Sequence, residues 1–226
     1  HIVDLLLQHN ADIHLVDSFQ RNALMYAIQT SSNTTESIEA LIKAGSLIDH
    51  QDVYQNTPLH IAVKKRNIEA VQLLLEHGAQ INLTNNNHET PLIIASQNND
   101  IESIQLLIEY GANQNIQDID GLTALMWSVK HSNYYNMTYI LDVLRTLYTS
   151  ETNVNMQDNQ GRTAIIWASL LDQPDIIIFL YSREGSIHMK DNNNQTALQL
   201  ALEHNSIRSI HYLEKFTTIE SFKQSL

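Results

Sequence analysis

Hydrophobic residues recur along the chain at the spacing of helices that are buried on one side only. Offsets of 0, 3, 6 and 7 describe one apolar group and, 33 residues later, a second one: Ile68, Val71, Leu74 and Leu75, then Ile101, Ile104, Leu107 and Ile108. Each group is followed by a glycine, Gly78 or Gly111, which tolerates the left-handed backbone that closes a helix. The pattern therefore predicts one amphipathic helix in each copy.

A second recurring pattern precedes these helices and sets the period of the repeat. The stretch Asn56–Val63, NTPLHIAV, returns as RNALMYAI, ETPLIIAS, LTALMWSV, RTAIIWAS and QTALQLAL. Its Thr position falls at residues 22, 57, 90, 123, 163 and 196, with Asn22 in place of Thr, so the spacings are 35, 33, 33, 40 and 33. Thr57 and Pro58 are typical of an N-cap and a first helical residue. The chain is thus an array of a 33-residue unit that contains two helices.

Each copy of this pattern follows an Asp or Asn by five residues. These residues are Asp17, Asp52, Asn85, Asp118, Asp158 and Asp191. Their side chains bond to nearby backbone amides and so favour a turn, and two of the turns also contain glycine, Gly121 and Gly161. Two short helices cannot bury their own apolar faces, so each unit must pack on its neighbours. The pattern predicts a solenoid.

Residues 52–83, DVYQNTPLHIAVKKRNIEAVQLLLEHGAQINL, resemble a single ankyrin repeat, with the Thr-Pro-Leu-His box at 57–60 and Gly-Ala at 78 and 79. The resemblance covers nearly the whole chain. It implies an all-α ankyrin-repeat solenoid of stacked helix-turn-helix units joined by β-turn or hairpin-like loops. Only Thr57 and Thr90 keep Thr-Pro-Leu, only His60 keeps the box His, and four turns lack the usual Gly. In the family this His forms hydrogen bonds between adjacent repeats.

We expect a single ankyrin-repeat domain over residues 1–226. It comprises a partial repeat at 1–16 and repeats at about 17–51, 52–84, 85–117, 118–157, 158–190 and 191–226. The partial repeat is a second helix without its first, so we expect undisplayed residues upstream or a weakly protected end. Residues 213–226 have lost the motif and are expected to form a capping helix or to open one more degenerate unit.

The repeat at 118–157 contains seven extra residues, which is close to two helical turns. Apolar residues continue at helical offsets through 132–150, so we expect one over-long second helix that projects beyond the stack. This elongation either packs on the protein itself or forms a ledge for a partner, which would include Tyr134 and Tyr135. Trp127 and Trp167 occupy the same position in their repeats as Ile61 and Ile94 and are expected in the core.

Composition narrows the classes of function. Lys and Arg number 13 against 25 Asp and Glu, and the net charge of −12 repels nucleic acid and anionic membranes. The chain has no Cys, no apolar run that could span a bilayer, no metal-ligand spacing among its His, and no phosphate-binding glycine loop. We therefore expect no catalytic residue, no cofactor and no metal site, and a monomer in the cytoplasm of the producing cell, or of a host cell if secreted.

The resemblance implies that the chain binds a protein partner through the concave face, which the turn tips and the first helices line. Aromatic and Arg side chains often dominate such interfaces, and Phe19 and Tyr54 stand on turns that have no core to bury them. The first helices place Lys64, Lys65, Lys130 and His131 on this face, followed by Leu170 and Leu171. This order favours an extended partner segment with acidic and then apolar character. The predicted contact residues are Phe19, Arg21, Tyr54, Asn56, Lys64, Lys65, Asn98, Leu122, Lys130, His131, Arg162, Leu170, Leu171, Tyr134 and Tyr135.

Two other functions remain open at this point. The array could be the targeting or substrate-selecting part of a larger enzyme or bacterial effector whose catalytic domain lies outside residues 1–226. It could also be a structural spacer or a self-association module, which would show a mass that depends on concentration.

Overall fold

The computed structural model describes residues 2–30 and 34–224, apart from the side chains of residues 2, 4, 34, 134 and 224. Its elements are α1 (Ile2–Gln8), α2 (Ala23–Gln29), α3 (Thr34–Lys43), α4 (Pro58–Lys64), α5 (Ile68–Glu76), α6 (Pro91–Gln97), α7 (Ile101–Glu109), α8 (Ala124–Lys130), η1 (Ser132–Tyr134), α9 (Met137–Leu147), α10 (Ala164–Leu170), α11 (Pro174–Tyr181), α12 (Ala197–Glu203) and α13 (Ile207–Gln224). Within the described ranges, extended backbone pairs only at two isolated bridges, Val16 with Asn22 and Lys190 with Thr196. The fold is a helical ankyrin-repeat solenoid.

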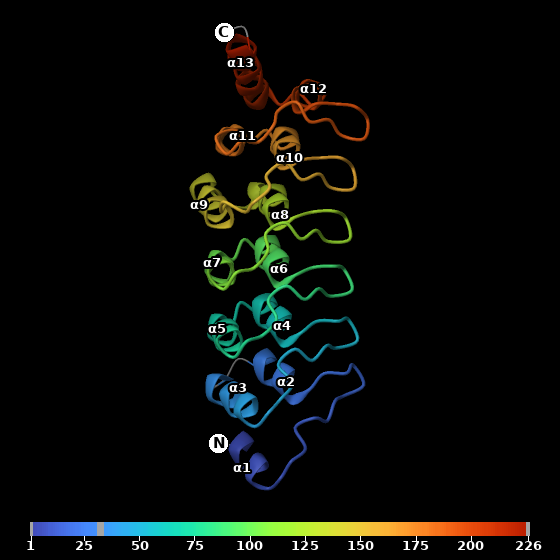
Figure 1. Ribbon diagram of the computed structural model, residues 1–226, viewed down its shortest axis with the longest axis vertical. Helices are drawn as coiled ribbons and strands as arrows, with labels where there is room; N and C mark the ends of the chain where they lie inside the picture. The colour runs from blue at the N-terminus through green and yellow to red at the C-terminus, as the bar shows by residue number, and fades with distance from the viewer. Residues whose placement is uncertain (1, 31–33, 225–226) are drawn as a thin grey trace. The chain divides into compact units, whose positions relative to one another are not determined.

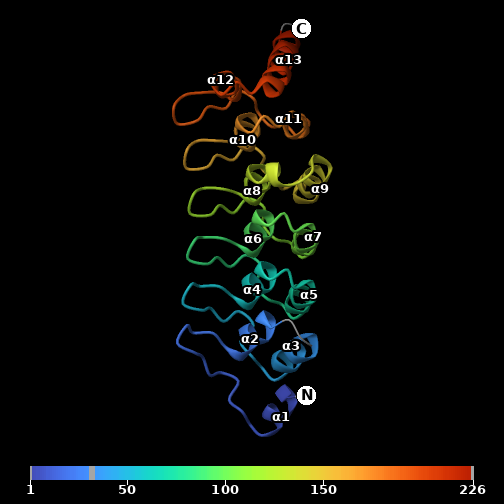
Figure 2. The same cartoon turned by 180° about the vertical axis from the view of Figure 1, so that it is seen from behind.

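The chain divides into two compact units, which are described separately. Unit 1 comprises residues 1–95 and 100–113, and unit 2 comprises residues 96–99 and 114–226. In unit 1, α4 packs on α2, and α3 packs on both α1 and α5. In unit 2, α10 packs between α8 and α12, and α11 contacts α9 and α13. Within each unit the turns extend from the column of first helices, on the side away from the second helices (Figures 1 and 2).

One Asp or Asn side chain organises each turn. Its Oδ1 atom accepts the backbone amides of the residues two and four positions later, at 2.8–3.0 Å in all six turns. The accepting residues are the six predicted from the sequence: Asp17, Asp52, Asn85, Asp118, Asp158 and Asp191. The turn signal in the sequence therefore has a direct structural cause.

The absence of Gly from four turns does not change their backbone. The residue three positions after the Asp or Asn has a positive φ in every turn: 59° at Gln20, 62° at Gln55, 58° at His88, 79° at Gly121, 77° at Gly161 and 64° at Asn194. A Cβ at Gly121 would lie 2.6 Å from the backbone nitrogen of Asn159 in the next turn. In the four turns without Gly, φ at this position is 58–64°, compared with 77–79° at the two glycines.

The first helices begin at the predicted caps. The Thr57 hydroxyl accepts the amide of His60, and the side chain of Asn22, which replaces Thr, accepts the amide of Met25. Both helices have 7 residues, and fully buried residues anchor each of them: Leu24 and Met25 in α2, and Leu59, Ala62 and Val63 in α4. Helices of this length are not stable on their own and depend on packing. The N-caps add to the stability that packing provides.

The expectation of one over-long helix at residues 132–150 is wrong. The 3₁₀ turn η1 ends at residue 134, Tyr135 is extended with φ −132°, and α9 starts afresh after Asn136. The Asn136 side chain accepts the amide of Tyr139 at 2.8 Å and so caps a new helix. Compared with the unit of α4 and α5, three extra residues precede α9, two lengthen it and two follow it.

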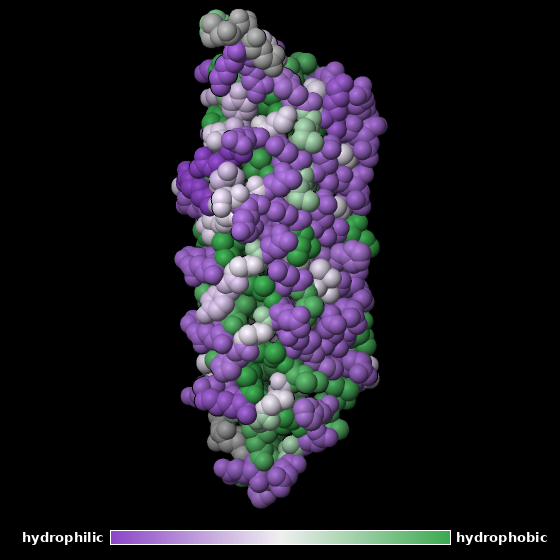
Figure 3. Space-filling view, viewed as in Figure 1, coloured by the Kyte–Doolittle hydropathy of each residue, from purple (hydrophilic) through white to green (hydrophobic). Residues whose placement is uncertain are grey.

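The N-terminal end of unit 1 exposes apolar surface on α1. Leu6 is 54% exposed, whereas Val3 and Leu7 are half-buried. These three residues help to line a hollow of about 560 Å³ between α1 and α2, and apolar residues are visible at this end of unit 1 in Figure 3. The weak protection of this end from amide exchange stays a prediction.

The last repeat of unit 2 ends in a helix of 18 residues, α13, which continues through residues 213–224. The role of these residues as a cap stays a prediction. The Asp172 side chain reaches across from the loop before α11 and accepts the amide of Ser209 at 2.8 Å. The rings of Tyr181 and Phe216 stack with their centroids 4.1 Å apart. These contacts attach the long helix to the preceding repeat.

Replacing Gln55 by Gly should stabilise the protein. A left-handed backbone costs an L residue about 1–2 kcal/mol, and part of the gain is lost to the greater entropy of Gly in the unfolded chain, which leaves about 0.5–1 kcal/mol. Gln55→Val should instead destabilise, because a β-branched residue tolerates this conformation least. Urea unfolding of the parent and both variants tests the order; a Gly variant less stable than the parent would contradict it.

Candidate partner-binding groove

A groove of about 420 Å³ lies on unit 1, where two turn tips meet the end of a first helix. Six of its lining residues were predicted as partner contacts: Phe19, Arg21, Tyr54, Asn56, Lys64 and Lys65. The other lining residues are Gln29, Asp52, His60 and Ile61. The structure thus brings together predicted residues from three separate segments of the chain. We refer to these ten residues as the unit 1 groove.

Backbone hydrogen bonds between adjacent tips hold the rim of this groove. The amide of Val53 donates to the carbonyl of Phe19 at 3.0 Å, and the amide of Asn86 donates to the carbonyl of Tyr54 at 3.0 Å. The side chains of the two rim aromatics remain accessible, since Phe19 is 47% exposed and Tyr54 is 58% exposed. A fixed backbone with exposed aromatic side chains suits partner binding, because little conformational entropy is lost on association.

Arg21 is a structural element of the groove rather than a free cation. Its Nε and Nη2 atoms donate to Asp17 Oδ2 at 2.9 and 2.7 Å, and Nη2 also donates to the Tyr26 hydroxyl oxygen. The guanidinium lies 5.0 Å from the Phe19 ring centre and 4.7 Å from that of Tyr26. Desolvation raises the pKa of Asp17, but hydrogen bonds from Arg21, Tyr26 and the Phe19 amide outweigh it and hold that pKa well below its usual range.

Lys64 and Lys65 are exposed at the end of α4. Among the residues that the structure describes, neither side chain has a hydrogen-bond or ion-pair partner. The Asp52 carboxylate also lines the groove, but it is 6% exposed and accepts the amides of Tyr54 and Asn56. The accessible charge of the groove is therefore positive, in a chain of net charge −12.

His60 lies at the base of the groove and is 1% exposed. Its Nδ1 atom bonds within the Thr57 capping box, and its Nε2 atom lies 3.0 Å from the carbonyl oxygen of Glu89 in the next repeat. Burial, the largest effect, lowers the pKa of His60, while the bond to Glu89 opposes the shift. His60 is thus a neutral residue that joins two repeats, as the resemblance implied.

The predicted cations of unit 2 lie in a different environment. The Lys130 ammonium is 4.8 Å from the ring centre of Trp127 and 5.0 Å from that of Trp167, and Arg162 is 5.0 Å from Trp167. His131 Nδ1 lies 2.8 Å from the carbonyl oxygen of Gln97. Cation–π contacts and this bond therefore hold these side chains in place.

The two tryptophans are not core residues, contrary to the expectation. Both are half-buried, and their Nε1 atoms donate to Asp118 Oδ2 at 2.7 Å and Asp158 Oδ2 at 2.9 Å. The polar Nε1 atom needs a partner, which the second oxygen of each turn carboxylate supplies. Leu122 was predicted at an accessible tip, but this prediction is wrong, because the residue is buried and only 2% exposed.

The remaining predicted contacts also lie on unit 2. Leu170 and Leu171 are half-buried at the end of α10, and the Tyr135 hydroxyl donates to the carbonyl of Asn98 at 3.0 Å. Tyr135 and Asn98 are thus brought together, and the region after α8 packs on the protein instead of projecting. The side chain of Tyr134 lies outside the described residues.

Sequence reasoning missed one recurring contact that shapes these sites. The turn Asp bonds through Oδ2 to an aromatic residue nine positions later in three repeats: Asp17 with Tyr26, Asp118 with Trp127 and Asp158 with Trp167. The signal was the coincidence of Asp and a polar aromatic at this fixed spacing. Asp52 has Ile61 at that position and leaves a pocket there instead.

The groove contains one carboxylate, Asp52, and one imidazole, His60, and both bond to backbone groups of the fold. Across residues 2–30 and 34–224, no group of three or more His, Asp or Glu residues is placed to hold a metal ion. No helix in the same ranges is long and apolar enough to cross a membrane. The chemistry available in the groove is hydrogen bonding, ion pairing and apolar contact.

Replacing His60 by Gln should make stability less sensitive to acid. A free His binds a proton near pH 6.5, whereas folded His60 does so only at lower pH, so the parent loses stability as pH falls below about 6.5. Gln199 is the natural model for this replacement, because its side chain completes the Thr196 capping box.

The variant should be about 1 kcal/mol less stable at pH 7, since Glu89 loses a donor, but should lose less than the parent between pH 7 and 5. Urea unfolding at pH 7, 6 and 5 measures both quantities. Equal acid-induced losses would refute the assignment of a neutral His60.

Comparisons with known proteins agree with this architecture. A family model described as ankyrin repeats (3 copies) matches residues 1–85, 81–146 and 139–220. The crystal structure of the ankyrin repeat domain of Bcl-3, described as a unique member of the IkappaB protein family, superposes with a TM-score of 0.79 at 24% identity. That match covers 94% of this chain and 90% of the Bcl-3 chain. No curated protein matches the sequence. The chain belongs to the ankyrin-repeat family.

Proposed function

We propose that this chain is a non-catalytic interaction module that binds a protein partner through the unit 1 groove. Ankyrin repeats are generally protein–protein interaction modules and are typically non-catalytic. The observation that carries the proposal is the grouping, in one groove, of exposed Phe19 and Tyr54 with Lys64 and Lys65, which have no hydrogen-bond or ion-pair partner among the described residues. Exposed aromatics on a rigid frame are typical binding hot spots.

The partner that fits this groove is an extended protein segment with acidic and apolar character. The net charge of −12 disfavours nucleic acid, which would also need a continuous basic surface. We expect the chain to act as a monomer in a cytoplasm, that of the producing cell or of a host. The alternative function is that of the targeting or substrate-selecting part of a larger enzyme or bacterial effector, in which case the same groove selects the substrate.

Affinity capture tests the proposal. The parent and a Tyr54→Ala, Lys64→Glu variant are used to capture proteins from a lysate of the source cell, with mass spectrometry as readout. The matched control is Tyr110→Ala, Lys215→Glu, which makes the same changes at an exposed Tyr and an exposed Lys outside the groove. We expect a protein that the parent and the control retain and that the groove variant loses by about tenfold or more.

Circular dichroism must show that all three proteins are folded. Equal retention by the groove variant and the parent would contradict binding through unit 1. Light scattering of the parent over a range of concentrations separates a monomer from a self-association module, since the mass of the latter rises with concentration.

A further inference from the structure

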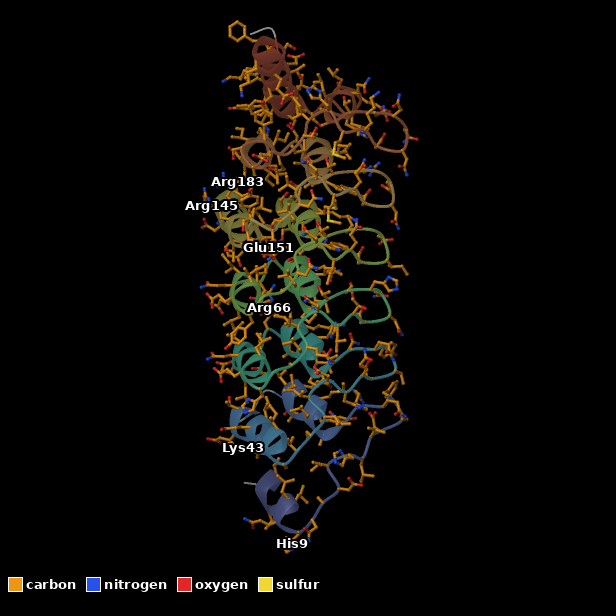
Figure 4. The ribbon with its side chains drawn as sticks, viewed as in Figure 1. His9, Lys43, Arg66, Arg145, Glu151 and Arg183 are labelled. Atoms are coloured by element: carbon orange, nitrogen blue, oxygen red, sulfur yellow. The ribbon has the colours of Figure 1, made fainter. Side chains whose placement is uncertain are left out.

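The basic side chains of the protein differ in whether they already contact a carboxylate or an aromatic ring within the protein. Lys43 pairs with Glu39, Arg145 pairs with Asp142, and Arg183 lies 5.2 Å from the ring centres of Tyr148 and Phe179. Figure 4 places Lys43 in unit 1, and Arg145 and Arg183 in unit 2, on the side of the second helices. Arg21, Lys130 and Arg162 are held by aromatic rings or carboxylates, as described above.

Lys64 and Lys65 differ from this group, because both are exposed and neither is neutralised within the described ranges. Both side chains line the groove, and each ammonium group can pair with an incoming carboxylate. Lys64 and Lys65 therefore form a cationic subsite that is suited to neighbouring acidic side chains.

The apolar part of the groove lies toward the tips. Phe19 and Tyr54 expose about half of their surface there, and Ile61, which is 8% exposed, contributes to the lining. Arg21 lies over the Phe19 ring and is itself fixed by Asp17, so it positions the ring without being available to a ligand. These residues form an apolar subsite for one large side chain.

The spacing of the two subsites restricts the ligand. Tyr54 lies in the turn before α4, Ile61 lies within α4 and Lys64 is its last residue, so the lining of the groove follows α4, whose 7 residues are about 10 Å long. An extended chain covers this distance with about three residues, because it advances roughly 3.3–3.6 Å per residue. A helical ligand would need about seven residues for the same span, at 1.5 Å per residue.

We propose that the unit 1 groove recognises an extended peptide in which a large apolar side chain lies about three residues from a pair of carboxylates. The apolar side chain contacts Phe19, Tyr54 and Ile61, and the carboxylates pair with Lys64 and Lys65. This inference rests on the proposed function and adds the chemistry and spacing of the segment that is bound.

Synthetic peptides test the inference. Two fluorescein-labelled probes, Gly-Ser-Phe-Ser-Gly-Glu-Glu-Gly-Ser and its reversed sequence, cover both chain directions. For each probe, one control replaces both Glu by Gln, one replaces Phe by Ser, and one places Phe directly beside the Glu pair. Fluorescence anisotropy at 50 and 300 mM NaCl reports binding to the full chain.

We expect one probe to bind, and each of its controls to bind about tenfold or more weakly, since burial of a Phe side chain and an ion pair each contribute at this level. Lys64→Glu, Lys65→Glu should weaken binding and remove the loss of affinity at high salt, whereas Lys215→Glu, Lys223→Glu, with the same change in net charge, should retain that loss. Lys215 and Lys223 are both exposed on α13.

Failure of both probes to bind, or binding of the Gln control as tight as that of its probe, would overturn the inference. The capture experiment shows separately whether the proposed function fails with it. A partner that the Tyr54→Ala, Lys64→Glu variant loses, together with inactive peptides, would leave groove binding intact and reject only the Phe and Glu-pair chemistry.

Discussion

A single carboxylate or amide oxygen that accepts two backbone amides is the interaction on which the rest of this protein depends. It recurs in all six turns at 2.8–3.0 Å and positions the tip relative to the first helix. These bonds fix the backbone conformation of each tip. Adjacent tips within a unit can therefore form backbone hydrogen bonds, as Phe19 and Val53 do in unit 1 and Asp120 and Asn159 do in unit 2. The exposed side chains of the tips then stand on a rigid frame.

The second oxygen of the same side chain decides what each tip offers to a partner. Where an aromatic residue lies nine positions later, the oxygen accepts its polar hydrogen, and a nearby Lys or Arg stacks on the ring. Where Ile61 occupies that position, no ring fills the space, and the unit 1 groove opens beside Lys64 and Lys65. The unit 1 groove thus lies beside the turn of Asp52, which lacks the internal aromatic contact.

The repeat period, the turns and the helix caps could be predicted from residues, because each depends on contacts within a few positions of the chain. Asn22 acts as the N-cap in place of Thr, and Gln55 adopts the left-handed backbone without Gly, so the local chemistry tolerates these departures. The predicted long helix was wrong for a local reason as well. Helical offsets continued through residues 132–150, but the capping by Asn136 prevailed over them.

The sequence by itself determined the fold and identified the six residues of the unit 1 groove that were predicted as contacts, since periodic spacing and local hydrogen bonds are written in the order of residues. Only the tertiary structure decided which cations are free. Lys130 and Lys64 have equivalent positions in the repeat, but Lys130 lies between two tryptophans that come from different repeats, whereas Lys64 meets no partner in the described chain. Contacts between residues far apart in the chain, such as that between Lys130 and Trp167, depend on packing, which periodicity along one chain segment cannot specify.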